Sequence, residues 1–195
     1  MSKQPSATTR RMRPFSAATR GLTTKPTALV QATDADFQWM LDGRRQEPRP
    51  LRLPPGGVEA PATLAVIRSM TAELHKRGCS ASWMVVAGDE VVGLCSYRRP
   101  PKNGEVEIGY GIAPSRRQAG YATRAVAALL EYARRDCSVS VVIAETAVLN
   151  IASQRVLEKN GFERAGTHTD PEDGEVVMWR KELEHSSTAS ASSSK

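Results

Sequence analysis

The sequence is poor in cysteine and in aromatic residues, and it has no long apolar run. Its three cysteines, Cys79, Cys95 and Cys137, lie far apart without a C-x-x-C pair, so we expect reduced thiols rather than a disulfide framework or a zinc site. The three histidines do not cluster, and we predict no metal site. No apolar stretch approaches the ~20 residues that a membrane helix needs, and no secretory signal follows the first residue.

Acidic residues are missing from the first 25 positions, which hold six of the 27 basic residues. The rest of the chain is therefore neutral, and the formal net charge of +6 belongs to this segment. Because a nucleic-acid-binding domain needs a basic face on its folded part, nucleic acid is not an expected partner. Residues 1–25 are predicted to be a disordered tail, with an organelle transit peptide as the alternative. A second, Ser-rich tail is predicted at 185–195, which leaves 26–184 as one domain of a cytoplasmic protein.

Short apolar segments alternate with helical patterns between the two tails. Thr33 and Asp36 form a capping-box-like helix start, and Gly78 is the expected cap after a helix that begins at Pro61. Strands are expected at 27–32, 82–87, 91–98, 105–113, 139–145, 162–169 and 175–183, and helices at 33–41, 61–77, 119–135 and 150–160. A meander followed by strand–helix–strand units indicates an α/β fold with a mixed sheet, in which 139–145 is buried on both faces.

The segment 112–123, IAPSRRQAGYAT, places a short polar loop between a strand and a long helix. The first N–H groups of a helix lack internal partners and lie at the positive end of its dipole, so they form an anion site. Gly120 and Ala122 let a phosphate approach the backbone, and Arg116 and Arg117 add positive charge. We interpret the segment as a phosphate cradle, with an ordinary loop bearing surface arginines as the alternative. GxxxxGK[ST] and GxGxxG are both absent, which argues against the common nucleotide sites.

Residues 117–122, RQAGYA, resemble the (Q/R)xxGx(G/A) pyrophosphate loop of the GNAT superfamily of N-acetyltransferases. The preceding EVEIGYGIAP resembles the fourth strand of that family, and NIAS at 150–153 with VLEKNGF at 156–162 resembles its second cofactor motif. The resemblance covers 27–183 and is strongest to the branch that contains ribosomal-protein N-terminal acetyltransferases. It implies the GNAT fold, a mixed and mostly antiparallel sheet flanked by helices and splayed between its fourth and fifth strands.

The resemblance further implies acetyl-CoA as the co-substrate, with its pantetheine arm between the strands at 105–113 and 139–145. Gly109 and Gly111 fit a close approach to the first of these strands, and a plain sheet irregularity is the alternative. The residues expected to bind the cofactor are Ile112, Ala113, Arg117, Gln118, Ala119, Gly120, Tyr121, Ala122, Thr123, Asn150 and Ser153.

Acetyl transfer needs a base for the amine proton and a group that stabilises the departing thiolate. Glu107 lies on the strand where the family carries a glutamate base and is the predicted base, with Glu105 and Glu145 as alternatives. Many members carry a tyrosine acid where this chain has Leu157. Ser153 is therefore predicted to stabilise the thiolate, unless its hydroxyl only bonds the backbone at a helix start.

The predicted function is acetyl-CoA-dependent transfer of an acetyl group to a primary amine, by direct attack in a ternary complex. The sequence leaves open whether the acceptor is a small-molecule amine or a peptide N-terminus, and whether the protein is a homodimer. Neither nucleic acid nor a membrane is an expected partner. The alternative function is a non-catalytic acyl-CoA-binding module. Trp39, Trp83 and Trp179 are expected in the core rather than in the site.

Overall fold

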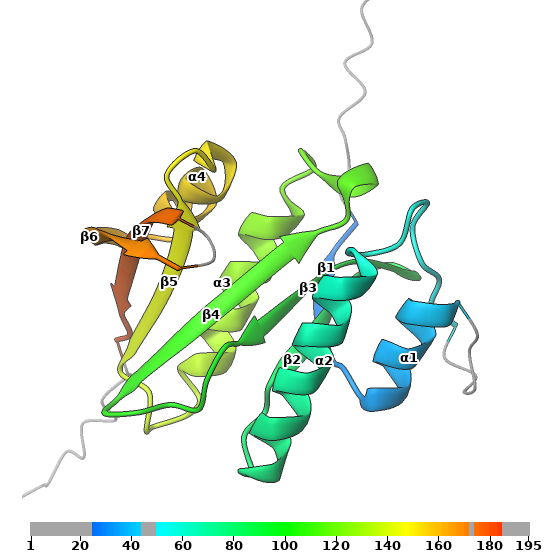
Figure 1. Ribbon diagram of the computed structural model, residues 1–195, viewed down its shortest axis with the longest axis horizontal. Helices are drawn as coiled ribbons and strands as arrows, with labels where there is room; N and C mark the ends of the chain where they lie inside the picture. Colours follow the sequence, from blue (N-terminus) through cyan, green and yellow to red (C-terminus); the bar gives the residue numbers. More distant parts are fainter. Residues whose placement is uncertain (1–24, 44–49, 172–173, 185–195) are drawn as a thin grey trace, which may run out of the picture.

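The computed structural model describes residues 25–43, 50–171 and 174–184 of the chain and contains a seven-stranded sheet (Figure 1). Its order is β1-β2-β3-β4-β5-β7-β6, and every neighbouring pair is antiparallel except β4 and β5. The strands are β1 (Thr27–Gln31), β2 (Ser82–Ala87), β3 (Glu90–Tyr97), β4 (Glu105–Ile112), β5 (Val141–Ala147), β6 (Glu163–Asp170) and β7 (Gly174–Glu182). The helices are α1 (Asp34–Asp42), α2 (Pro61–Lys76), α3 (Tyr121–Ala133) and α4 (Ile151–Lys159). The predicted α/β fold with a mixed sheet is confirmed, whereas the predicted tails lie outside the described residues apart from Lys25.

Helices cover both faces of the sheet. Figure 1 shows α1 and α2 on one face and α3 on the opposite face. Both sides of β2 and β3 are buried as a result, and every residue of these two strands is inaccessible or nearly so. Among the described residues, no helix is long and apolar enough to cross a membrane.

The ends of the first two helices follow from local chemistry. The Thr33 hydroxyl accepts the N–H of Asp36, and the Asp36 carboxylate accepts the N–H of Thr33, so the predicted capping box is present. After α2, Gly78 adopts a left-handed φ of +74° and donates its N–H to the His75 carbonyl. These caps fix where α1 begins and where the chain leaves α2 to enter β2.

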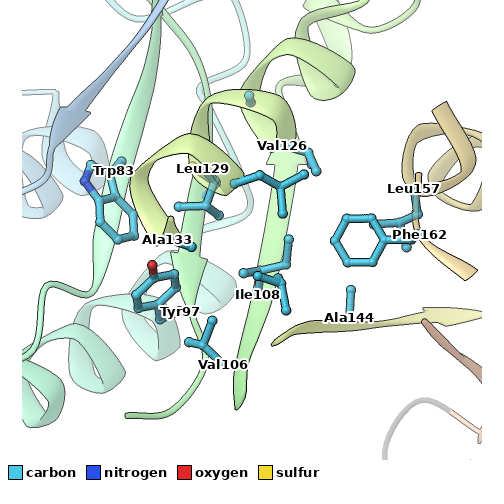
Figure 2. Packing of buried hydrophobic residues seen from close by; sticks show 14 of the residues in the cluster. Trp83, Tyr97, Val106, Ile108, Val126, Leu129, Ala133, Ala144, Leu157 and Phe162 are labelled. Atoms are coloured by element: carbon cyan, nitrogen blue, oxygen red, sulfur yellow. The ribbon is translucent and has the colours of Figure 1, made fainter. Parts of the chain in front are cut away.

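The larger core cluster lies between the sheet and α3 (Figure 2). The Trp83 ring meets Tyr97 edge-on, with ring centroids 5.2 Å apart. Leu157 and Phe162 extend this cluster beside Ala144 and close it at the α4 end (Figure 2). The three tryptophans are all buried, as expected, in the two core clusters that contain Trp39, Trp83 and Trp179.

The sheet opens between its two parallel strands. Pairing of β4 with β5 runs from Glu105↔Val141 to Ile108↔Ala144 and then stops, while β5 continues along β7 and β4 along β3. This is the predicted splay between the fourth and fifth strands. The prediction that β5 is buried on both faces is wrong beyond its first two residues, because Ile143, Glu145 and Ala147, which alternate along one face of the strand, are only half-buried.

Candidate active site

Two cavities lie against β4. The larger, of about 580 Å³, opens where β4 and β5 separate and extends across the start of α3 to α4. Its volume is in the range of ligand pockets. Most residues predicted to bind the cofactor line it, namely Ile112, Arg117, Gln118, Gly120, Tyr121, Ala122, Thr123, Asn150 and Ser153. Ala113 and Ala119 are not among the lining residues. Ala113 is fully buried and donates its N–H to the Val92 carbonyl, and the Ala119 carbonyl accepts a hydrogen bond from Arg124.

The loop before α3 has the backbone shape of an anion site. Gln118 and Gly120 adopt left-handed φ angles of +64° and +73°, and such turns gather N–H groups in one concavity. Gly120 is the N-cap residue of α3. Within the described part of the chain no side chain caps this turn, so its N–H groups face the cavity without a competing acceptor. This geometry is compatible with an anion at the start of α3, and the phosphate cradle stays a prediction.

Arg116 anchors this loop rather than facing the cavity freely. Its guanidinium donates to both carboxylate oxygens of Glu90, at 2.6 and 2.9 Å, and the Glu90 side chain is 8% exposed. Hydrogen bonding by Arg116 holds the pKa of Glu90 below its ordinary value. Arg52 donates to the same carboxylate at 3.1 Å and ties the segment before α2 to the pair. Arg117 remains as the loop arginine available to a ligand.

Two further positively charged side chains line the cavity, and the sequence motifs did not identify them as site residues. Arg155 and Lys159 both lie on α4, four residues apart and therefore on one face of the helix. Only the placement of α4 across the splay brings them opposite the start of α3, where these two helices contact each other. With Arg117 they give the cavity three positively charged lining side chains besides the paired Arg116, which suits binding of a polyphosphate.

Asn150 and Ser153 lie at the start of α4. The Asn150 side-chain oxygen caps the helix by accepting the Ser153 N–H at 3.1 Å. The amide nitrogen of the same side chain takes no part in this cap. Tyr110 reaches across the splay from β4 and donates its hydroxyl to the Ser153 carbonyl at 3.1 Å. Burial raises the pKa of Tyr110 to about 12, so this phenol stays protonated. Among the described residues the Ser153 hydroxyl itself makes no hydrogen bond and faces the cavity.

A second cavity, of about 230 Å³, lies between α2 and the surface of β3 and β4. Its walls are mainly apolar and include Ile67, Met70, Leu94 and Cys95. Three residues line both cavities: Glu59, Tyr110 and Gly111. The two spaces therefore meet at the free half of β4.

Comparisons with known proteins agree with this arrangement. Residues 27–163 match the acetyltransferase (GNAT) domain family. The chain belongs to this family. Its GNAT fold is also found in solved structures. The ribosomal L7/L12 α-N-protein acetyltransferase RimL in complex with coenzyme A has a TM-score of 0.60 and 22% identity, with 83% of this chain and 95% of that chain covered. An aminoglycoside acetyltransferase, AAC(6')-Ib in complex with coenzyme A, has a TM-score of 0.59 and 21% identity, with 80% and 95% covered.

Curated relatives of this GNAT chain are similar over part of their length. The uncharacterized N-acetyltransferase YjdG of Bacillus subtilis (strain 168) is 37% identical over 84 residues, which is 42% of this chain and 50% of that protein. The ribosomal-protein-serine acetyltransferase of Escherichia coli (strain K12) is 31% identical over 90 residues, 46% of this chain and 50% of that protein. The chain thus spans about half the length of the curated relatives it matches.

Glu107, the base predicted from the resemblance to GNAT enzymes, lies on β4 outside the residues that line either cavity. Its side chain is 2% exposed. Arg99 donates to one carboxylate oxygen through Nε at 2.7 Å and also through a second nitrogen, and Arg98 lies 3.3 Å from the other oxygen. Glu105 is exposed and lies 3.9 Å from Arg180. The sequence contained the signal for this clamp, since a hairpin places Arg98 beside Glu107 on the neighbouring strand.

Glu145, the other alternative, lies apart from both cavities. It faces β6, where His168 Nε2 is 3.7 Å from its carboxylate. Asp170 completes a group whose ligand-type atoms lie within 4.8 Å of one another. The sequence places His168 and Asp170 two positions apart but gave no sign that Glu145, which lies 23 residues before His168 on another strand, joins them. Leu157, at the position where many members of the family carry a tyrosine, is fully buried in the core.

Proposed function

We propose that this protein transfers the acetyl group of acetyl-CoA to a primary amine. The observation that carries the proposal is the cavity of about 580 Å³, which joins the uncapped start of α3 to the opening between β4 and β5. A pyrophosphate fits the N–H groups of the turn at Gly120, and its charge is complemented by Arg117, Arg155 and Lys159. Coenzyme A in the RimL and AAC(6')-Ib structures supports the same ligand class here.

The chemistry proposed for the α4 end of this cavity uses two side chains. Asn150 has its amide nitrogen free to donate to a carbonyl of the pantetheine arm, because its oxygen is committed to the helix cap. Ser153 has its hydroxyl free to donate to the sulfur as the carbon–sulfur bond breaks. Tyr110 holds the backbone of Ser153 and so fixes where that hydroxyl points. The role of Glu107 as base stays a prediction.

The experiment that tests the function combines binding with turnover. Calorimetry with acetyl-CoA should give one site per chain, and release of free thiol should follow when a primary amine is added. The panel comprises 2-phenylethylamine, a peptide with an apolar N-terminal residue, spermidine and kanamycin. Binding without thiol release for every amine would leave the alternative, an acyl-CoA-binding module. Absence of binding would refute the site as well.

A further inference from the structure

We infer that Glu59 binds the ammonium group of the acceptor and removes its proton, and that the cavity beside it selects a monoamine carried on an apolar group; this inference rests on the proposed function. Glu59 lies on the segment that leads into α2, between Val58, which is buried, and the first turn of the helix. It is the carboxylate that both cavities share.

The position of Glu59 follows from a glycine on the neighbouring strand. A Cβ on Gly111 would lie 3.2 Å from Glu59 Oε2, which is tighter than an ordinary contact, so the missing side chain makes room for the carboxylate. The other oxygen, Oε1, accepts the N–H of Ala60 at 3.0 Å and is thereby oriented. Within the described residues Oε2 has no hydrogen-bond partner, and Glu59 is half-buried between the two cavities. An ammonium group that enters from the apolar cavity meets this oxygen.

Acyl transfer takes place where the donor and acceptor spaces meet. The acetyl thioester has to reach the free half of β4 from the side of α3, and the amine has to reach it from the side of α2. Glu59, Tyr110 and Gly111 are the residues at that junction. Glu107 lies four residues before Gly111 on the same face of β4, roughly 13 Å away along a strand. Both of its oxygens are already paired with arginines, whereas one oxygen of Glu59 is available.

The proton and bond balance is as follows. Glu59 takes one proton from the ammonium, and the neutral amine nitrogen attacks the thioester carbonyl carbon to form a carbon–nitrogen bond. The carbon–sulfur bond then breaks, and the remaining excess proton on nitrogen passes to the sulfur. The products are the amide and the free thiol of CoA, and protonated Glu59 returns its proton to water. No oxidant or reductant is required.

The walls of the smaller cavity restrict the acceptor. Ile67, Met70, Leu94 and Cys95 present apolar surface, and among the described residues its charged lining groups are Glu59 and Arg98. One carboxylate can neutralise one ammonium, and a second cationic group of the acceptor would face Arg98 or an apolar wall without compensation. A polyamine or an aminoglycoside is therefore a poor fit. A monoamine whose neighbouring carbon carries an apolar group fits both features.

The test compares Glu59→Gln with Glu107→Gln, and uses Glu73→Gln on the exposed side of α2 as the matched control. With 2-phenylethylamine, Glu59→Gln should lower kcat/KM by about 10²-fold or more at pH 7, and the defect should shrink as the pH rises because more amine is already neutral. Amine affinity, measured calorimetrically with CoA present and no acetyl group, should fall at least tenfold. Acetyl-CoA affinity should change by less than threefold, and Glu73→Gln should match the wild type.

Each remaining outcome has a distinct meaning. If the wild type transfers acetyl groups but Glu59→Gln keeps wild-type rates and amine affinity, this inference is overturned while the proposed function stands. If Glu107→Gln alone produces the pH-dependent defect, the base is Glu107 and the inference is also overturned. Higher kcat/KM for spermidine or kanamycin than for 2-phenylethylamine would overturn the selection for monoamines. A wild type that transfers to no amine overturns both proposals.

Discussion

Replacing Gly120 by alanine separates the anion site from the stability of the fold. Gly120 has φ of +73°, a conformation that costs a residue with a Cβ roughly 1–2 kcal/mol. The new Cβ would lie 3.0 Å from Nη1 of Arg124, whose guanidinium bonds Thr27 and Ala119, so the end of this side chain has to shift by a few tenths of an ångström to accommodate the methyl group. The loss of stability should therefore be about 1–2 kcal/mol, a fall in Tm of roughly 2–8 °C.

The effect on binding should be larger than this strain explains. A methyl group at the start of α3 stands where a phosphate has to approach the N–H groups, and each hydrogen bond to a charged oxygen contributes about 1.5–3 kcal/mol. Loss of one such bond corresponds to an increase of roughly 10- to 150-fold in the Kd for acetyl-CoA. The measurement is isothermal calorimetry on folded protein, with Tm recorded in parallel.

Gly78→Ala is the matched control for Gly120→Ala. Gly78 has φ of +74°, and nothing lies within 4 Å of its Cβ position, so the variant carries the same backbone strain far from the cavity. We expect a similar loss of stability and a Kd within twofold of the wild type. The reasoning is refuted if Gly120→Ala binds acetyl-CoA as tightly as Gly78→Ala. Equal weakening in both variants would attribute the effect to stability instead.

Three further predictions concern single contacts. Tyr110→Phe removes the hydrogen bond to Ser153, so the free energy of unfolding measured by denaturation should fall by about 1 kcal/mol. The Kd for acetyl-CoA, measured by calorimetry, should rise about threefold. Unchanged values would mean that this contact across the splay contributes nothing. Glu90→Gln should lower the free energy of unfolding by about 2 kcal/mol at pH 7 and by less as the pH falls below 4.5. The pKa of Glu90 is lowered in the folded protein, so its ion pair with Arg116 stabilises the fold above that pH and loses its effect below it. Burial raises the pKa of Cys95 to about 12 from 9.0, so this thiol should contribute a fall in stability of about 1.4 kcal/mol per unit between pH 9 and 12, and Cys95→Ala should reduce the measured slope by that amount.

Sequence patterns predicted the fold well because its determinants are local. The capping box at Thr33, the left-handed glycine after α2 and the alternation of short strands with helices each involve residues a few positions apart. The loop, the glycine and the helix start that make up the predicted phosphate cradle are also contiguous, so their backbone arrangement could be predicted, while phosphate binding there stays a prediction. The start of β5, two residues later than expected, illustrates the usual uncertainty at element ends.

The residues proposed for the acceptor side of the site could not be predicted in this way. Glu59 stands 52 residues from Gly111, and only the packing of α2 on the sheet brings the carboxylate to the free half of β4. Arg155 and Lys159 show a helical spacing that fits any exposed helix face. The strand on which Glu107 lies predicts it as the base, but the two arginines that hold it follow β3, and their effect depends on the register of the hairpin.

The sequence IGYGI at 108–112 explains how one strand can serve two cavities. Where β4 loses β5 as a partner, its residues continue to alternate between the two faces of the sheet. Tyr110 points to the α4 side and holds Ser153, on the wall that would carry the thioester. Gly111 lies on the opposite face and leaves room for Glu59 beside the apolar cavity. A side chain at position 111 would fill the space beside Glu59 where the two cavities meet. Loss of the phenol at position 110 would remove the hydrogen bond that ties β4 to Ser153. In the proposed reaction this alternation would let the donor and the acceptor approach β4 from opposite faces, and the reacting atoms would meet only where the strand has lost its neighbour.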